Sequence, residues 1–243
     1  MTLNKTAGFT IIETMLFLGI SAMLIVGLLV GSGTAINRER YNDSLRSLQS
    51  TIQQQYAEAV NVSNENTGKL ACSGETVPVG QSSCVLLGKY ITPSSDGKLL
   101  NIKNVLGVKG DSFSLDDAQG KSEADVLKNQ IGIMISPVGE QTYATEWDTK
   151  MTIPKSSNPI KFSMLVVHSP VSGLIRTFID SSQIISDNEI NSILLDDKNL
   201  DNSLEICVDP NDLFRGKQSS IFISADAVSS SGVDMRGDAI SGC

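Results

Sequence analysis

Few residues in this chain could carry out catalysis. His168 is the only histidine, and it directly precedes Ser169. A histidine and a serine can act as base and nucleophile, but such pairs are defined by geometry in the fold, which adjacency in the sequence does not supply. A histidine at the surface or at the end of a strand is the simpler interpretation. The sequence therefore predicts a protein that is not an enzyme, with no catalytic residues.

An acidic segment near residue 200 has the residue types of a calcium loop. Its potential oxygen ligands are Asp197, Asn199, Asp201 and Glu205. Calcium prefers such carboxylate and amide oxygens, but the glycine and the final bidentate glutamate of an EF-hand loop are absent. The alternative interpretation is a solvated acidic loop. The sequence predicts no cofactor and no metal ligand set, and calcium at this segment is the one candidate.

The element that organises the rest of the chain is an apolar run near residue 13. About 24 uncharged residues separate Glu13 from Arg38, enough for a helix to cross a hydrocarbon core of roughly 30 Å. An ionised carboxylate in lipid costs at least a few kcal/mol unless it is paired. A cleaved signal peptide is the alternative, but its apolar core is shorter and its cut site follows that core. The sequence predicts a membrane-spanning helix in which Glu13 needs a partner.

The residues Gly8-Phe9-Thr10-Ile11-Ile12-Glu13 resemble the class III leader of type IV pilins and pseudopilins. In that family a short leader ends in Gly, and Phe and a fifth-position Glu follow. The resemblance is close over roughly residues 1–60 and holds in outline beyond them. It implies that a prepilin peptidase cuts between Gly8 and Phe9 and methylates the new Phe9 amine. It also implies that Glu13 of one subunit meets the Phe9 amine of the next.

Two features depart from the family pattern. Thr14 stands where the family usually has an aliphatic residue, and the proline often found near the end of the membrane helix is missing, with Val30 and Gly31 there instead. Gly27, Gly31 and Gly33 could soften the helix, because glycine lowers helix propensity by about 1 kcal/mol.

Residues 37–60 continue the helix in amphipathic form. Apolar side chains recur at steps of three or four residues, at Tyr41, Leu45, Leu48, Ile52, Tyr56 and Val60. One helix over residues 9–60 would reach about 78 Å. We expect Tyr41 and Tyr56 to pack in a core and not to bind a ligand.

The domain organisation follows from these elements. It comprises a leader (1–8), a transmembrane and polymerisation helix (9–36), its amphipathic continuation (37–60) and an extracytoplasmic head (61–243). Strand-like composition is found at residues 85–91, 131–136, 161–168, 173–179 and 220–225, with a hairpin turn at 169–173 and a short helix from Ser186. The sequence predicts an α+β fold with an antiparallel sheet packed on the long helix, which the pilin resemblance also implies.

Four cysteines in a translocated head favour disulfides. They can pair in three ways, and proximity in the sequence favours Cys72 with Cys84 and Cys207 with Cys243. The closed loops would contribute about 3 and roughly 4 kcal/mol. Zinc is the alternative, but a close Cys-x-x-Cys pair is missing. A closing loop at Cys243 is similar to the disulfide-bounded region near the end of many pilins.

Charge bears on the choice of partners. The net charge is −8, and the first 43 residues contribute three charges of each sign, so the head is acidic and a broad nucleic-acid surface is not expected. The resemblance implies other pilin subunits, the peptidase and methylase, an assembly platform protein and the membrane as partners. Asn42 and Asn61 match the acceptor pattern for N-glycosylation, a pattern that is common by chance.

These observations predict a minor pilin or pseudopilin, held in the inner membrane and then assembled into an extracellular filament. The alternatives are a pseudopilin of a type II secretion or DNA-uptake machine and a single-pass binding domain that does not polymerise. Arg38 and Arg40 outnumber Lys5, so the positive-inside rule alone would place the head in the cytoplasm. The expected disulfides and the leader motif indicate the opposite orientation.

Overall fold

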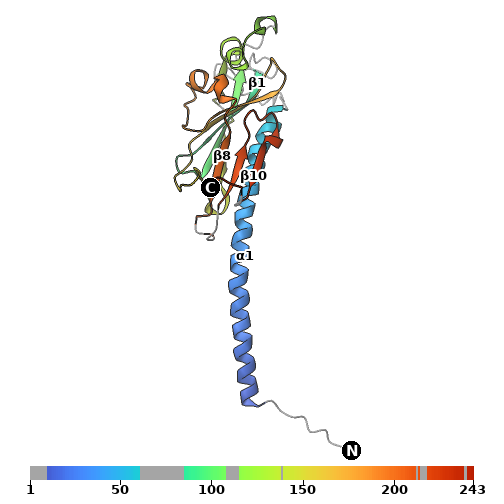
Figure 1. The fold of residues 1–243 in the computed structure, drawn as a ribbon, viewed down its shortest axis with the longest axis vertical. Helices are drawn as coiled ribbons and strands as arrows, with labels where there is room; N and C mark the ends of the chain where they lie inside the picture. The colour runs from blue at the N-terminus through green and yellow to red at the C-terminus, as the bar shows by residue number, and fades with distance from the viewer. Residues whose placement is uncertain are drawn as a thin grey trace, which may run out of the picture.

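A 50-residue helix, α1 (Ile11–Val60), runs from the N-terminal end of the molecule into a head of antiparallel strands (Figure 1). The structure is a computed structural model that describes residues 10–60, 85–107, 115–137, 139–211, 213, 218–237 and 240–243. At 1.5 Å per residue, α1 is about 75 Å long. The prediction of one continuous helix and an α+β fold is confirmed.

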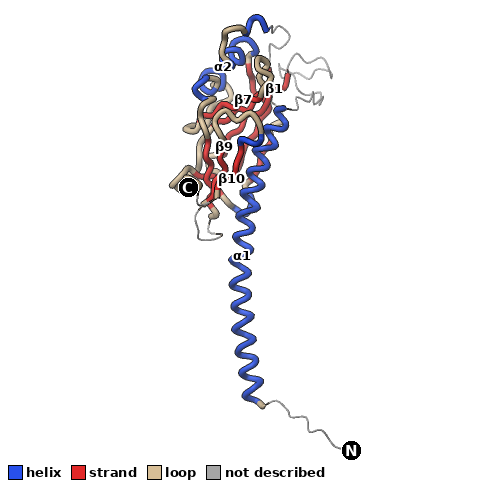
Figure 2. Tube along the Cα trace, turned by 45° about the vertical axis from the view of Figure 1, so that its right-hand side comes forward, coloured by secondary structure: helices blue, strands red, loops and turns tan. Residues whose placement is uncertain are grey.

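The second half of α1 packs against the head along one stripe (Figure 2). The buried residues of the helix are Tyr41, Ser44, Leu45, Leu48, Ile52, Gln55, Tyr56 and Ala59. Val60 was predicted to belong to this stripe, but it is 55% exposed. Ala59 takes its place, because a step of three residues after Tyr56 keeps the stripe at the helical period of 3.6.

Tyr41 and Tyr56 pack in the core, as predicted, and their hydroxyl groups are hydrogen bonded. The Tyr41 hydroxyl donates to the Val208 carbonyl at 2.9 Å and accepts from the Ser219 amide at 2.7 Å. The Tyr56 hydroxyl lies 3.1 Å from Thr177 Oγ1. Burial raises the pKa of Tyr56 to about 12. Both rings therefore anchor the helix in the head.

The strands form two antiparallel sheets in the described part of the chain. The first has the order β3-β2-β1-β6-β7, with β4 also paired to β2. Its strands are β1 (Val85–Pro93), β2 (Leu99–Gly107), β3 (Ile133–Ile135), β4 (Gln141–Ala144), β6 (Ser163–His168) and β7 (Ile175–Asp180). The second has the order β10-β9-β8-β5. Its strands are β5 (Lys150–Thr152), β8 (Leu204–Asp209), β9 (Ser219–Ile223) and β10 (Val233–Arg236).

Two hydrophobic cores follow from the alternation of side chains along the strands. On β6, Met164 and Val166 face the core that joins α1 to both sheets, whereas Leu165 and Val167 face a second core. Short helical segments cover this second core. They include η2 (Leu115–Ala118), α2 (Glu123–Asp125), η3 (Val126–Ile131), η5 (Ile190–Leu194) and η6 (Asp197–Asn199). Two further turns are η4 (Glu146–Asp148) and η7 (Ser230–Gly232).

The five predicted strands are confirmed with shifted ends, and the strand predicted for 131–136 is shortened because Ile131 ends η3. The hairpin turn after His168 is confirmed, with Gly173 at φ 70°. The helix predicted from Ser186 begins later, at Ile190. Ser186 does hydrogen bond Glu189, at 2.5 Å, but these residues form a turn that precedes the helix.

Candidate assembly helix

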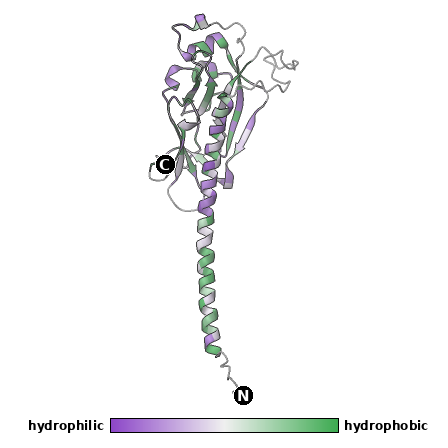
Figure 3. Cartoon of the chain, turned by 90° about the vertical axis from the view of Figure 1, so that its right-hand side faces the viewer, coloured by the Kyte–Doolittle hydropathy of each residue, from purple (hydrophilic) through white to green (hydrophobic). Residues whose placement is uncertain are grey.

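Among the described residues, none packs around the first half of α1. No residue from Ile11 to Arg40 is buried, and neighbouring side chains such as Met23 and Leu24 are 81% and 64% exposed. This part of the helix is long and apolar enough to cross a membrane. Figure 3 shows hydrophobic residues along the part of α1 that extends away from the head. In the described part of the chain this surface is bare on every side, and contact with lipid or with other helices would remove it from water.

A capping box closes the N-terminal end of α1. Glu13 Oε2 accepts hydrogen bonds from the Thr10 amide at 3.0 Å and from Thr10 Oγ1 at 3.1 Å. The Glu13 amide donates to Thr10 Oγ1 at 3.3 Å. The spacing Thr-x-x-Glu is a sequence signature of this motif. Our sequence analysis assigned Glu13 an assembly role and overlooked Thr10, although the signature was visible.

Other polar side chains of this half are satisfied within the helix. Thr14 Oγ1 donates to the Ile11 carbonyl at 2.9 Å, and Thr34 Oγ1 donates to the Gly31 carbonyl at 2.9 Å. Hydroxyl groups bonded in this way are compatible with lipid. The departure from the pilin pattern at Thr14 is therefore compatible with a membrane span.

Glu13 is the one charged group in the apolar stretch. Within the described ranges no Lys, Arg or His side chain forms an ion pair with it. Gly8 and Phe9 lie outside the described residues, so the predicted cleavage, methylation and pairing at Phe9 stay predictions. What the structure adds is that Thr10 holds the Glu13 carboxylate at the helix end, where the helix dipole favours a negative charge.

If α1 assembles into filaments, as the pilin resemblance implies, replacing Thr10 with valine should reduce assembly, because valine keeps the shape but removes the hydroxyl that fixes Glu13. Loss of an N-cap costs about 1 kcal/mol, or roughly fivefold in an equilibrium. Thr10→Ser retains the hydroxyl and is the matched control. The measurement is the amount of each variant in sheared filaments relative to its membrane pool. Equal amounts for both variants would show that the cap plays no part.

The head holds the second half of α1 firmly. The nearly buried Lys89 side chain on β1 forms an ion pair with Glu58 of α1 at 2.7 Å and donates to Asn104 at 2.9 Å. Burial raises the pKa of the Glu58 carboxyl, but hydrogen bonds from Lys89 and Gln54 outweigh that effect and hold it below its usual range. These contacts tie the C-terminal end of α1 to β1 and β2.

The predicted pairing of Cys207 with Cys243 is confirmed, and their Cα atoms lie 5.8 Å apart. The disulfide fastens the C-terminal end of the chain to β8, and the Gly242 amide adds a hydrogen bond to Glu205 at 2.9 Å. Cys72 and Cys84 lie outside the described residues, so their pairing stays a prediction.

The four calcium candidates do not converge on one point. Asn199 is buried, and its amide donates to the Ile193 and Leu194 carbonyls at 3.0 and 2.9 Å. Glu205 lies on β8, where it accepts from Ser220 and Gly242. Asp197 and Asp201 are exposed. No group of three His, Cys, Asp or Glu side chains suited to a metal occurs among the described residues, and the calcium hypothesis gains no support.

His168 and Ser169 lie at the end of β6 and at the start of the turn that follows it. His168 is half-buried, and the Ser169 hydroxyl donates to the Glu123 carboxylate. Ser169 also accepts a hydrogen bond from the Val171 amide at 3.1 Å, which shapes the turn. The contacts of Ser169 are those of a structural residue.

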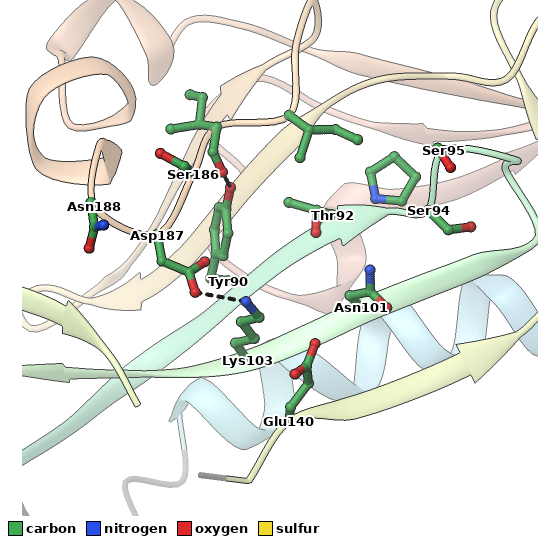
Figure 4. Close-up of a pocket in the computed structure, with 13 residues that line it drawn as sticks. Tyr90, Thr92, Ser94, Ser95, Asn101, Lys103, Glu140, Ser186, Asp187 and Asn188 are labelled. Atoms are coloured by element: carbon green, nitrogen blue, oxygen red, sulfur yellow. Dashed lines mark hydrogen bonds and ion pairs between the residues drawn. The ribbon is translucent and has the colours of Figure 1, made fainter. Parts of the chain in front are cut away.

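A polar groove of about 660 Å³ opens on the head between the ends of β1 and β2 and the loop 184–188 (Figure 4). Lys103 and Asp187 form an ion pair across it at 2.7 Å, and the Tyr90 hydroxyl donates to the Ile185 carbonyl at 2.5 Å. Thr92, Asn101 and Glu140 add hydroxyl, amide and carboxylate groups to the lining, beside the apolar Pro93 and Ile184. Such a groove can form hydrogen bonds with a polar ligand.

Comparison with known proteins gave no match, either to protein-family models or to curated proteins or solved structures.

Proposed function

We propose that this chain is a subunit of a type IV pilus or a related filament, as a minor pilin or pseudopilin. The observation that carries the proposal is the first half of α1, an apolar helix exposed on all sides that bears one carboxylate at its capped end. A simple anchor needs the apolar helix but not the carboxylate, which is costly in lipid. In a helix that leaves the lipid and packs against copies of itself, the carboxylate can pair with a positive charge on a neighbouring copy.

In the proposed sequence of events, a prepilin peptidase cuts after Gly8 and exposes the Phe9 amine, which is then methylated. The amine carries a positive charge and Glu13 a negative one, and neither is stable unpaired in an apolar medium. When subunits assemble, the Glu13 carboxylate of one subunit forms an ion pair with the Phe9 amine of its neighbour. Helix packing replaces lipid around the apolar half of α1, and charge pairing selects the register.

The same proposal assigns a location and partners. Before assembly the chain spans the inner membrane with its head outside the cytoplasm, where disulfides such as Cys207–Cys243 persist. It then joins an extracellular filament. The partners are other pilin subunits through α1, the peptidase and methylase, an assembly platform protein and the membrane. A head of this size favours a minor subunit.

The mature chain is expected to begin at Phe9 and to carry one added methyl group. Intact-mass measurement of the protein purified from membranes tests this expectation. A Gly8→Asp variant should stay uncut, because the peptidase needs glycine before the cut, whereas the matched Thr6→Ala variant should be processed.

Two outcomes would contradict the proposal. A chain that still begins at Met1 would favour the single-pass binding domain. A chain cut after residue 30 would show that the apolar run is a signal peptide. Either result ends the pilin interpretation.

A further inference from the structure

Trp147, the only tryptophan of the chain, adopts a backbone conformation that few bulky residues adopt. Its φ and ψ are 55° and 32°, and the next residue, Asp148, has a φ of 59°. The left-handed region suits glycine and asparagine, because a Cβ atom crowds the carbonyl oxygen there. Trp147 is also 46% exposed, so core packing does not offset that cost. Core packing therefore does not account for a tryptophan at this strained position.

The residues that flank Trp147 in the sequence form hydrogen bonds and an ion pair with α1 and with the head. Ser47 on the helix donates to Glu146 at 2.8 Å, and Ser44 hydrogen bonds Thr149 at 2.7 Å. Asp148 pairs with Lys98, and Asn211 donates to it at 2.6 Å. The acidic groups on either side of Trp147 are thus satisfied within the head, and the indole ring is the group presented outward.

The ring lies beside the point where α1 enters the head. The Arg40 guanidinium lies 4.7 Å from the ring centroid, and Arg40 is the last residue of α1 before the buried stripe begins at Tyr41. Along the helix, Arg40 lies 27 residues beyond Glu13, or about 40 Å. A bilayer measures roughly 40–45 Å with its headgroups included. If the uncharged run of α1 ends at the boundary of the hydrocarbon core, Arg40 lies three residues, or about 4.5 Å, beyond Asn37, within the headgroup layer, and Trp147 lies beside it.

We propose that Trp147 and Arg40 form a contact with phospholipid headgroups that holds the head at a fixed height on the membrane before assembly. Tryptophan favours this zone because its ring is apolar and its indole N–H is polar. The guanidinium can reach headgroup phosphates from the same position. The inference rests on the membrane-spanning helix of the proposed function, and it adds a specific lipid contact in the head.

Because Trp147 is the only tryptophan, its fluorescence reports this contact without labelling. The full-length chain is placed in phosphatidylcholine vesicles at low protein density. One set of vesicles carries lipids brominated near the headgroups, and another carries lipids brominated near the chain ends. We expect a larger loss of emission with the shallow bromines than with the deep ones. We also expect weaker quenching by aqueous acrylamide than in unfolded protein.

Flotation of the vesicles distinguishes a failure of the headgroup contact from a failure of the membrane anchor. Protein that floats but is quenched by neither lipid would overturn the headgroup contact and leave the proposed function intact. Protein that does not float would contradict the membrane anchor and with it the proposed function. A third outcome is that protection from acrylamide rises with protein density and that neither brominated lipid quenches the emission. That result would assign Trp147 to a contact between copies of the chain and overturn the proposal.

Two arginine variants test the pairing of Trp147 with Arg40. Arg40→Gln should weaken shallow quenching, because the ring loses the cation above it and the phosphate loses its partner. Arg46→Gln is the matched control, because Arg46 is exposed on the same helix about 9 Å further from the membrane. Equal loss of quenching in the two variants would overturn the role of Arg40.

Discussion

Replacing Glu13 with alanine should leave the chain in the membrane and remove it from filaments. The change deletes a carboxylate that is costly in lipid, so insertion should be at least as efficient as in the natural chain. It also deletes the proposed partner of the Phe9 amine. Breaking a buried charge pair costs about 3–5 kcal/mol, which is more than about a hundredfold in an equilibrium constant. The ratio of subunit in sheared filaments to subunit in membranes measures this effect.

Glu13→Gln separates the charge from the helix cap. Glutamine can replace glutamate in a capping box, so this variant retains the hydrogen bonds to Thr10 but carries no charge. If charge pairing drives assembly, the Gln variant should be lost from filaments as the Ala variant is. If the Gln variant assembles normally and the Ala variant does not, the role of Glu13 in assembly is to cap the helix. Normal amounts of both variants in filaments, with unchanged membrane pools, would deny Glu13 any assembly role.

The long helix could be predicted because its signals are local. The absence of charge from residue 14 to 37 defined the exposed half, and the step of three or four residues defined the buried stripe. The one error in the helix was Val60, at its C-terminal end. Ala59 and Val60 lie three and four residues after Tyr56, so the apolar period alone does not decide which of them is buried. Local periodicity was sufficient for the helix.

Three strands of the second sheet, β5, β8 and β10, were missed, although β9 was predicted. Strand β8 alternates Leu204, Ile206 and Val208 toward the core, a period of two that was visible in the sequence. We assigned Glu205, between them, to an acidic loop, since nearby acidic residues suggested calcium. β5 has three residues and pairs with β8 across more than 50 positions. No local pattern identifies such a strand.

The candidate site was predictable where its signals are local in the sequence. Glu13 could be recognised from its position in an apolar run, and Thr10 could have been recognised from the capping-box spacing. The contact of Arg40 with Trp147 could not, because it joins residues more than 100 positions apart and depends on a left-handed backbone at a residue type that disfavours it.

Cys243→Ser should lower the free energy of unfolding of the head by about 2–4 kcal/mol. Opening the disulfide removes a loop of 36 residues from the constraints on the unfolded chain. It also frees the end of the chain, where the Ser241 hydroxyl donates to the Gln218 carbonyl at 2.8 Å. Chemical unfolding of the detergent-solubilised chain, followed by circular dichroism, measures the change. Ser241→Ala is the matched control and should cost about 1 kcal/mol or less, because it removes one hydrogen bond and leaves the covalent closure in place.

The two cysteines should not be equivalent as sites of substitution. Cys207 is fully buried on β8, so Cys207→Ser also places an uncompensated hydroxyl in the core and should cost more than Cys243→Ser. Reduction of the natural chain should match Cys243→Ser if this disulfide is the only one that stabilises the head. A larger loss on reduction would measure the predicted Cys72–Cys84 bond. If Cys243→Ser unfolds at the same denaturant concentration as the natural chain, closure of the C-terminal loop does not stabilise the head.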